Sequence, residues 1–147
     1  MNRRLWLLLS AALVIVALLL YPSSQCHVSK TELTISPLKT FVIPVQEGYA
    51  VGFSFNVTNR AGCEINARNI HVFLRSLTYA DGREVTQNLD ETESVSAILP
   101  PGRTGVLSHT FNSYLPYQPT KLNLRVEMTF AETGPVLVFD GELPVLG

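Results

Sequence analysis

The stretch Lys121-Leu-Asn-Leu-Arg-Val-Glu-Met-Thr-Phe130 decides the fold class. Large apolar residues alternate in it with polar or charged residues without exception, so the pattern has a period of two rather than 3.6. One face of such a segment packs against a core and the other meets solvent. The sequence therefore predicts a half-buried β-strand over residues 121–130.

The same alternation recurs on both sides of this strand. A C-terminal hairpin is expected where Thr133-Gly134-Pro135 separates it from the apolar residues of 137–145. Asp81-Gly82 favours a tight hairpin turn, and Pro100-Pro101-Gly102 favours a type II corner. Strands are predicted upstream and between these turns at 51–58, 70–79, 84–86, 94–99 and 104–111, with short proline-interrupted edge strands at 32–36 and 41–45.

About seven to nine short strands and no amphipathic helix favour an all-β fold, an antiparallel Ig-like β-sandwich spanning residues 31–147. Two sheets pack together because each has one apolar face to bury. The predicted core consists of the apolar residues of the alternating segments: Val51, Phe53, Phe55, Val57, Ile70, Val72, Leu74, Leu122, Leu124, Val126, Met128, Phe130, Leu137 and Phe139.

A separate apolar segment precedes the sandwich. Residues 5–21 form an unbroken apolar run with Ser10 as its only polar interruption, and as a helix they would reach roughly 25 Å. The basic tip 1–4 contains Arg3 and Arg4, so the positive-inside rule places it in the cytoplasm. We expect a single-pass transmembrane signal anchor at 5–21, which contacts membrane lipid, followed by a stalk at 22–30 and an extracytoplasmic domain.

Two other interpretations of this segment remain open. A cleaved signal peptide has the same basic start, but its apolar region is usually shorter and ends at a small-x-small site, which the exit Tyr21-Pro22-Ser23-Ser24-Gln25 lacks. A lipoprotein would be acylated at Cys26 after a small residue, whereas Gln25 stands there.

The charge balance argues against nucleic acid as a partner. The chain has 12 acidic and 11 basic residues, and two of the basic residues belong to the predicted cytoplasmic tip. A nucleic-acid-binding domain normally presents a clustered basic face. The external domain is instead mildly acidic.

Catalytic motifs are missing from the sequence. The three histidines, His27, His71 and His109, have no cysteine, histidine or carboxylate at metal-ligand spacing, and Ser108 precedes His109 in a strand, so their side chains point to opposite faces. No GxSxG, HExxH, CxxC or phosphate-binding glycine loop occurs, and Met128 lacks the neighbours of a copper site. We expect no enzyme, no metal and no cofactor.

Two modifications are suggested by single residues. Cys26 and Cys63 are the only cysteines, and in an oxidising exterior they could form a disulfide between the stalk and the loop after strand 51–58. The alternative is that Cys26 lies too near the bilayer and both thiols stay free. Asn56-Val57-Thr58 is an N-glycosylation sequon whose Asn56 falls on the solvent side of its strand.

The order of these segments resembles two families. Phe53-Ser-Phe-Asn-Val-Thr-Asn-Arg60, Tyr79-Ala-Asp-Gly82 and Ile98-Leu-Pro-Pro-Gly102, with the aliphatic segments 65–77 and 106–111, resemble the late-embryogenesis-abundant type 2 (LEA-2-like) domain. The order is also similar to Ig-like archaeal surface proteins, including archaellum stator components with one N-terminal membrane helix. Both resemblances imply a β-sandwich with a binding or scaffolding role.

These observations predict a non-catalytic binding or scaffolding module at the cell surface or within a membrane complex. Its protein partner, which could be a second copy, would contact loops, and the candidates are 59–67, 90–94 and 112–121. The last loop carries stiff and aromatic residues suited to an interface: Tyr114, Pro116, Tyr117 and Pro119. The alternative is that the two tyrosines only close one end of the sandwich. A surface-filament subunit, donating residues 31–45 to a neighbour's sheet, is the second candidate function.

Overall fold

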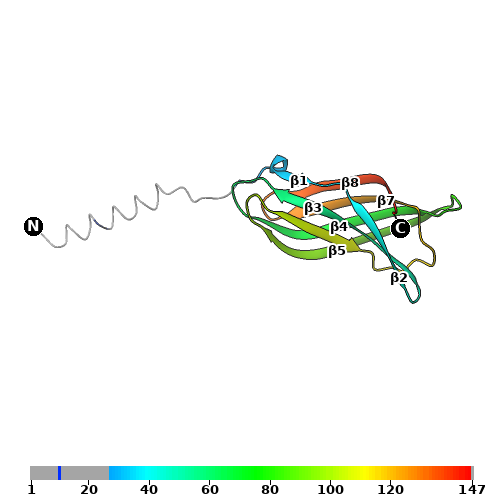
Figure 1. Ribbon diagram of the computed structural model, residues 1–147. Coiled ribbons are helices and arrows are strands. Elements are labelled where there is room, and N and C mark those ends of the chain that lie inside the picture. The colour runs from blue at the N-terminus through cyan, green and yellow to red at the C-terminus, as the bar shows by residue number, and fades with distance from the viewer. Residues whose placement is uncertain (1–9, 11–26, 147) are drawn as a thin grey trace, which may run out of the picture.

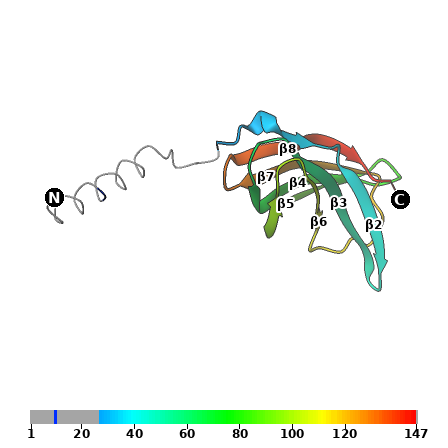
Figure 2. The ribbon, with the colours of Figure 1, turned by 60° about the vertical axis from the view of Figure 1, so that its left-hand side comes forward.

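Two antiparallel sheets packed face to face form the domain (Figures 1 and 2). The structure is a computed structural model that describes Ser10 and residues 27–146. Its strands follow a short 3-10 helix at Lys30–Glu32 and are β1 (Leu33–Ile35), β2 (Lys39–Val45), β3 (Gly48–Asn59), β4 (Ile65–Thr78), β5 (Glu84–Leu99), β6 (Thr104–Thr110), β7 (Lys121–Phe130) and β8 (Gly134–Pro144). The prediction of an all-β sandwich with seven to nine strands is confirmed for this part of the chain.

Strand β3 lies at the centre of the first sheet, which we call the β3 sheet. β1 and β2 pair with successive parts of one edge of β3, and β6 pairs with its other edge. The second sheet, called the β4 sheet, has the order β5-β4-β7-β8. β5 and β6 are therefore edge strands of different sheets, and the corner at Pro100–Gly102 carries the chain from one sheet to the other.

The core lies between the sheets and follows the predicted alternation closely. Val126, the register partner of Val72, is fully buried, as are the alternate residues before and after it in β7. Twelve of the predicted core residues are buried, which leaves only the two in β8. The period-two pattern therefore assigned the inward faces of β3, β4 and β7 correctly.

The prediction that Leu137 belongs to the core is wrong, and that for Phe139 is only half right. Leu137 is 52% exposed, and Phe139 is partly buried against the core. Val126 pairs with Phe139 but Glu127 pairs with Leu137, so β8 has an irregularity that leaves Val138 without a register partner. Because one extra residue inverts the alternation, Val136 and Val138 pack on the core in place of Leu137.

Segment 84–99 is one long strand rather than two strands around a loop. Asp90–Ser94 was expected to be an exposed loop, but these residues lie within β5 and all five pair with β4. Two register shifts accompany this pairing, and Asn88 adopts a positive φ of 47° near one of them. The acidic composition of the segment suggested a loop, whereas strand pairing with β4 overrode that local preference.

The predicted turns are present with one change. Gly102 has a φ of 74°, as expected for the glycine of the type II corner. Between β4 and β5 the connection spans Tyr79–Arg83 rather than two residues, and Gly82, with a φ of 82°, is the residue there with positive φ. The edge character of β1 and β2 is confirmed.

Most of the predicted N-terminal organisation lies outside the described residues. This applies to the basic tip 1–4, the membrane span 5–21 apart from Ser10, the first part of the stalk and Cys26. In the described part of the chain, no helix is both long enough and apolar enough to span a bilayer. The described end of the predicted stalk contacts the domain, because Val28 is buried in the core.

Candidate interaction surface at the distal rim

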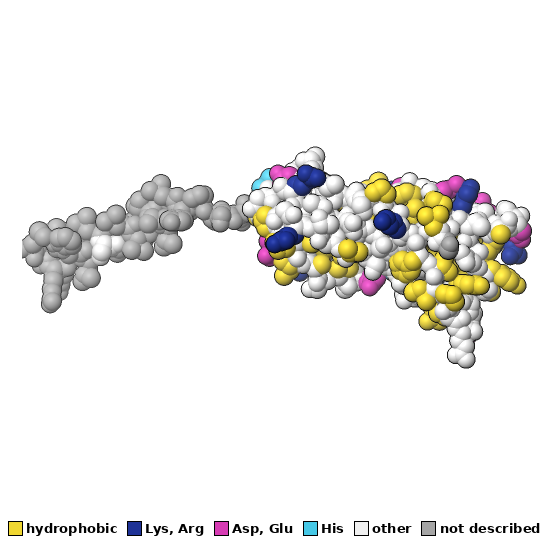
Figure 3. Space-filling view, viewed as in Figure 1, with side chains coloured by type: hydrophobic (Ala, Val, Ile, Leu, Met, Phe, Trp, Pro, Cys, Tyr) yellow, Lys and Arg dark blue, Asp and Glu magenta, His cyan; other side chains and the backbone are white. Residues whose placement is uncertain are grey.

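One end of the sandwich, opposite the end where residue 27 enters the domain, is formed by turns and one loop (Figure 1). These are the β2–β3 turn, the β4–β5 turn and the β6–β7 loop at 111–120. We call five side chains of the last two, the partly buried Tyr79 and the exposed Arg83, Tyr114, Pro116 and Tyr117, the distal rim. Hydrophobic side chains gather on this end of the molecule (Figure 3).

The β4–β5 turn holds the first half of the distal rim by hydrogen bonds. The main-chain nitrogen of Tyr79 donates to the carbonyl of Arg83, and that of Gly82 donates to the carbonyl of Tyr79. The Asp81 carboxylate accepts a 3.0 Å hydrogen bond from the Arg83 nitrogen. The Arg83 guanidinium lies 5.3 Å from the centre of the Tyr79 ring, a cation–π contact.

The β6–β7 loop carries the second half of the distal rim. Tyr117 meets Tyr79 edge-on, with ring centres 6.3 Å apart and planes at 89°. Its loop is fixed to the domain because the main chains of Tyr49 and Leu115 exchange hydrogen bonds of 2.8 and 2.9 Å. A side chain at position 48 would collide with the Leu115 carbonyl, so the glycine there permits this close approach.

A depression of about 440 Å³ lies between the two halves, lined by Tyr79, Ala80, Asp81, Arg83, Tyr117 and Gln118. Its walls combine aromatic rings, a cation, a carboxylate and an amide. Such a mixture of tyrosine and arginine is enriched at protein interfaces, because these side chains offer both apolar area and directional hydrogen bonds.

The structure places three of the four predicted contact residues in solvent. Tyr114 and Tyr117 are 58% and 64% exposed, and Pro116 is exposed as well. Pro119 is buried, so the prediction that it offers contact surface is wrong. The contact between Tyr117 and Tyr79 agrees in part with the end-closing alternative, whereas Tyr114 lies beside a separate depression next to Glu47.

The first residues of the loop at 59–67 are held in the domain by hydrogen bonds of a buried side chain. Asn59 is fully buried, its side-chain nitrogen donates to the carbonyls of Cys63 and Leu99, and its side-chain oxygen accepts from the nitrogen of Ala61. Cys63 is disulfide-bonded. Its predicted partner Cys26 lies outside the described residues, so that pairing stays a prediction. Asn56 is exposed, as predicted.

Sequence reasoning missed a cluster at the open side of the sandwich. His109 is 3% exposed, and its Nε2 and Nδ1 atoms lie 2.7 Å from carboxylate oxygens of Glu91 and Glu93. No carboxylate stands at metal-ligand spacing from His109 in the sequence, but the fold brings two carboxylates within hydrogen-bonding distance of its ring. Only the pairing of β4 with β5 reveals that both glutamates belong to one strand, and their spacing of two is the signal that they share its face.

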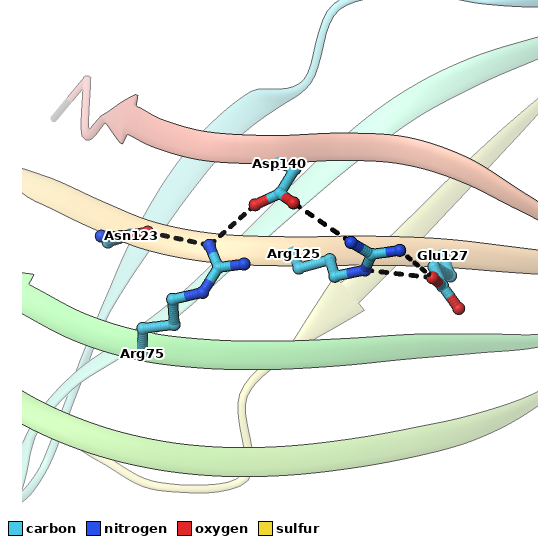
Figure 4. Close-up of polar contacts among 5 residues, drawn as sticks. All are labelled: Arg75, Asn123, Arg125, Glu127 and Asp140. Carbon is cyan, nitrogen blue, oxygen red and sulfur yellow. Dashed lines mark hydrogen bonds and ion pairs between the residues drawn. The ribbon is translucent and has the colours of Figure 1, made fainter.

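The outer face of the β4 sheet carries a charged network (Figure 4). Asp140 contacts both Arg75, at 2.8 Å, and Arg125, at 3.2 Å. Hydrogen bonding from Arg75 is the main cause that lowers the pKa of Asp140. A hydrogen bond to Glu127 is the main cause that raises the pKa of Arg125. Each cation is paired with a carboxylate, so the network stabilises a solvated surface and offers no free reactive group.

Within the described residues, no group of three or more histidine, cysteine, aspartate or glutamate side chains is arranged so that it could hold a metal ion.

Comparisons with known proteins find a similar fold among solved structures. No protein-family model and no curated protein matches this sequence. The Northeast Structural Genomics Consortium target SoR45 is similar in structure with a TM-score of 0.50 and 11% identity, over 80% of this chain and 88% of that one. This likeness shows the fold alone.

Two further structures are similar at lower scores. A protein from Archaeoglobus fulgidus gives a TM-score of 0.49 at 13% identity, covering 78% of this chain and 99% of that one. The putative ApaA protein from Bordetella pertussis gives 0.46 at 18% identity, covering 78% and 93%. The resemblances to LEA-2-like domains and to archaeal surface proteins stay predictions.

Proposed function

We propose that this protein is a membrane-anchored, extracytoplasmic β-sandwich that binds a protein partner through its distal rim and performs no catalysis. The observation that carries the proposal is the packing of the exposed Arg83 and Tyr117 on the partly buried Tyr79, with Tyr114 exposed on the same loop as Tyr117. Monomeric proteins rarely group large aromatic side chains in solvent without a binding role.

The location outside the cytoplasm is supported by two features. The apolar run 5–21 behind Arg3 and Arg4 fits a signal anchor with its N-terminus in the cytoplasm. A disulfide at Cys63 fits an oxidising compartment. Anchoring at the end where residue 27 enters would direct the distal rim away from the bilayer, toward a surface protein or a neighbouring subunit.

The filament alternative has weaker support. Its donor segment, residues 31–45, contains β1 and β2, and both strands already pair with β3 of the same chain. Donation would require breaking this pairing, including the seven register positions of β2. Binding through the distal rim, by contrast, requires no strand of the folded domain to leave its sheet.

Site-specific crosslinking in native membranes tests the proposed function. A photo-crosslinking amino acid at position 118, which lines the depression next to Tyr117, should capture a partner, and Tyr117→Ala in the same chain should abolish the capture. Val106→Ala is the matched control, because Val106 is 71% exposed on β6 and pairs with Asn56 near the end of β3 that leads away from the Tyr49–Leu115 contact. Capture that persists in Tyr117→Ala at the level of Val106→Ala would contradict a role for the rim.

Protease protection tests the location. In sealed cells, added protease should degrade the domain while the N-terminal sequence stays intact in the membrane. A soluble mature chain beginning near residues 23–26 would replace the anchor by a cleaved signal peptide.

A further inference from the structure

Three ionisable side chains meet inside the open side of the sandwich, where edge strand β5 of one sheet faces edge strand β6 of the other. Glu91 and Glu93 are register partners of Val72 and Ile70, which are fully buried, so both glutamates project from the core-facing side of β5. His109 is the register partner of the buried Phe53 and projects inward from β6. The three side chains therefore join the two sheets directly.

The histidine is held tightly in this position. Nε2 lies 2.7 Å from Oε2 of Glu91, whose side chain is 9% exposed, and Nδ1 lies 2.7 Å from Oε2 of Glu93, which is 50% exposed. The rings of Phe53 and Phe111 lie 5.9 and 5.3 Å away, centre to centre. The other oxygen of Glu91 accepts a 3.1 Å hydrogen bond from the main-chain nitrogen of Asn112.

Both short contacts require a proton between the atoms that they join. A neutral imidazole has one N–H, and an ionised carboxylate can only accept, so a neutral His109 between two carboxylates could satisfy one contact but not both. The closed arrangement needs one additional proton, whether the ring or a carboxyl group holds it. In a coupled set this proton belongs to the three groups together.

The arrangement does not suit a metal ion. Each ring nitrogen faces a different carboxylate, so the three groups do not converge on a single point, and none of the described residues forms a metal-binding group. No other ionisable side chain in residues 27–146 forms a hydrogen bond or an ion pair with His109; β3 and the segment after β6 contribute the rings of Phe53 and Phe111.

We propose that Glu91, His109 and Glu93 form a proton-dependent clamp that holds β5 to β6 and closes the open side of the sandwich. When the additional proton leaves, a ring nitrogen lone pair faces a carboxylate, and this contact becomes repulsive. The clamp then loosens beside a polar cleft of about 540 Å³ that its own residues line together with Ser94, Ser108, Thr110 and Asn112.

The sign of the effect follows from the proton count. Over the range in which the closed clamp holds one more proton than the unfolded chain, stability falls as the pH rises. Gain of this proton therefore tightens the sandwich, and its loss loosens it.

Urea unfolding of the full chain at pH 6 and pH 8 tests the clamp. One linked proton changes the unfolding equilibrium constant by at most about tenfold per pH unit, and we expect a wild-type increase of about fivefold or more from pH 6 to pH 8. Glu93→Gln should reduce this increase to about twofold or less, because an amide can donate to one ring nitrogen while Glu91 accepts from the other.

His71→Gln is the matched control, since His71 pairs with Asp90 on an exposed surface and should leave the pH dependence intact. The local readout is the amide NMR signals of residues 91–93 and 108–110, which should shift between the two pH values in wild type and stay fixed in Glu93→Gln. Equal pH dependence in wild type and Glu93→Gln, or amide shifts that persist in the variant, would overturn the proposal.

Discussion

The side-chain nitrogen of Asn59, at the end of β3, donates a 2.9 Å hydrogen bond to the main-chain carbonyl of Leu99, at the end of β5. This contact joins the two sheets where the chain crosses between them. Asn59→Ala would leave buried main-chain groups without partners and should destabilise the domain by at least about 2 kcal/mol. Chemical denaturation measures the loss, and Asn56→Ala, at an exposed position of the same strand, should stay within about 0.5 kcal/mol of wild type.

Val126 and Val106 form a matched pair for testing the assigned faces. Val126 is fully buried in β7, whereas Val106 is 71% exposed in β6. Val126→Ala should cost roughly 2 kcal/mol or more through lost burial and a cavity, and Val106→Ala should be nearly neutral. Equal costs in urea denaturation would mean that the inward face is assigned to the wrong side.

The disulfide at Cys63 should have Cys26 as its partner, because the sequence has no other cysteine. A non-reduced peptide digest analysed by mass spectrometry should contain the linked pair. Cys63→Ser should lower the free energy of unfolding by about 2–4 kcal/mol, the usual contribution of a bridge that closes a loop of this kind. A wild-type chain that stays unchanged on adding reductant would contradict this pairing.

Asp140 should contribute to acid sensitivity. Hydrogen bonding from Arg75 lowers its pKa in the folded chain below the ordinary value of 3.8, so the unfolded chain binds the proton more readily. The stabilisation is therefore present above about pH 4 and lost as the pH falls through the lowered folded value. Asp140→Asn should flatten the stability curve in that acid range, and Glu47→Gln, at an exposed turn residue, should leave it unchanged.

Alanine variants of Tyr114 and Tyr117 should distinguish a role in partner contact from a role in closing one end of the sandwich. Tyr117→Ala removes the edge-on contact with Tyr79 and should cost about 0.5–1.5 kcal/mol, whereas Tyr114→Ala should cost less. Partner capture should depend on both residues. Loss of stability without loss of capture in either variant would assign the tyrosines to closing the sandwich.

The period-two sequence pattern correctly predicted strands, such as β7, that pair with a neighbouring strand on each side. β7 has regular register with β4 over most of its length, so its alternation in sequence equals its alternation in space. The pattern failed at Leu137, because the irregularity in β8 depends on pairing with β7, and at 90–94, because pairing with β4 keeps an acidic segment extended.

Composition pointed to the half of the distal rim on the β6–β7 loop, but not to Tyr79 and Arg83, nor to the cluster at His109. The aromatic residues and prolines near Tyr114 predicted a contact surface, whereas the burial of Pro119 is evident only in the packed structure. His109 and its two glutamates are separated by 16 and 18 residues, and only the crossing between sheets brings them together. Contacts between different sheets are set by topology, which one sequence does not encode in any short window.

The paired main-chain hydrogen bonds between Tyr49 and Leu115 have a kinetic consequence for recognition. They fix the middle of the β6–β7 loop on β3, so the loop that carries Tyr114 and Tyr117 is already ordered. Binding of the proposed partner would then avoid most of the entropy cost of ordering that loop. The association rate should then depend mainly on encounter and orientation. Differences in affinity between related partners should appear mainly in the dissociation rate.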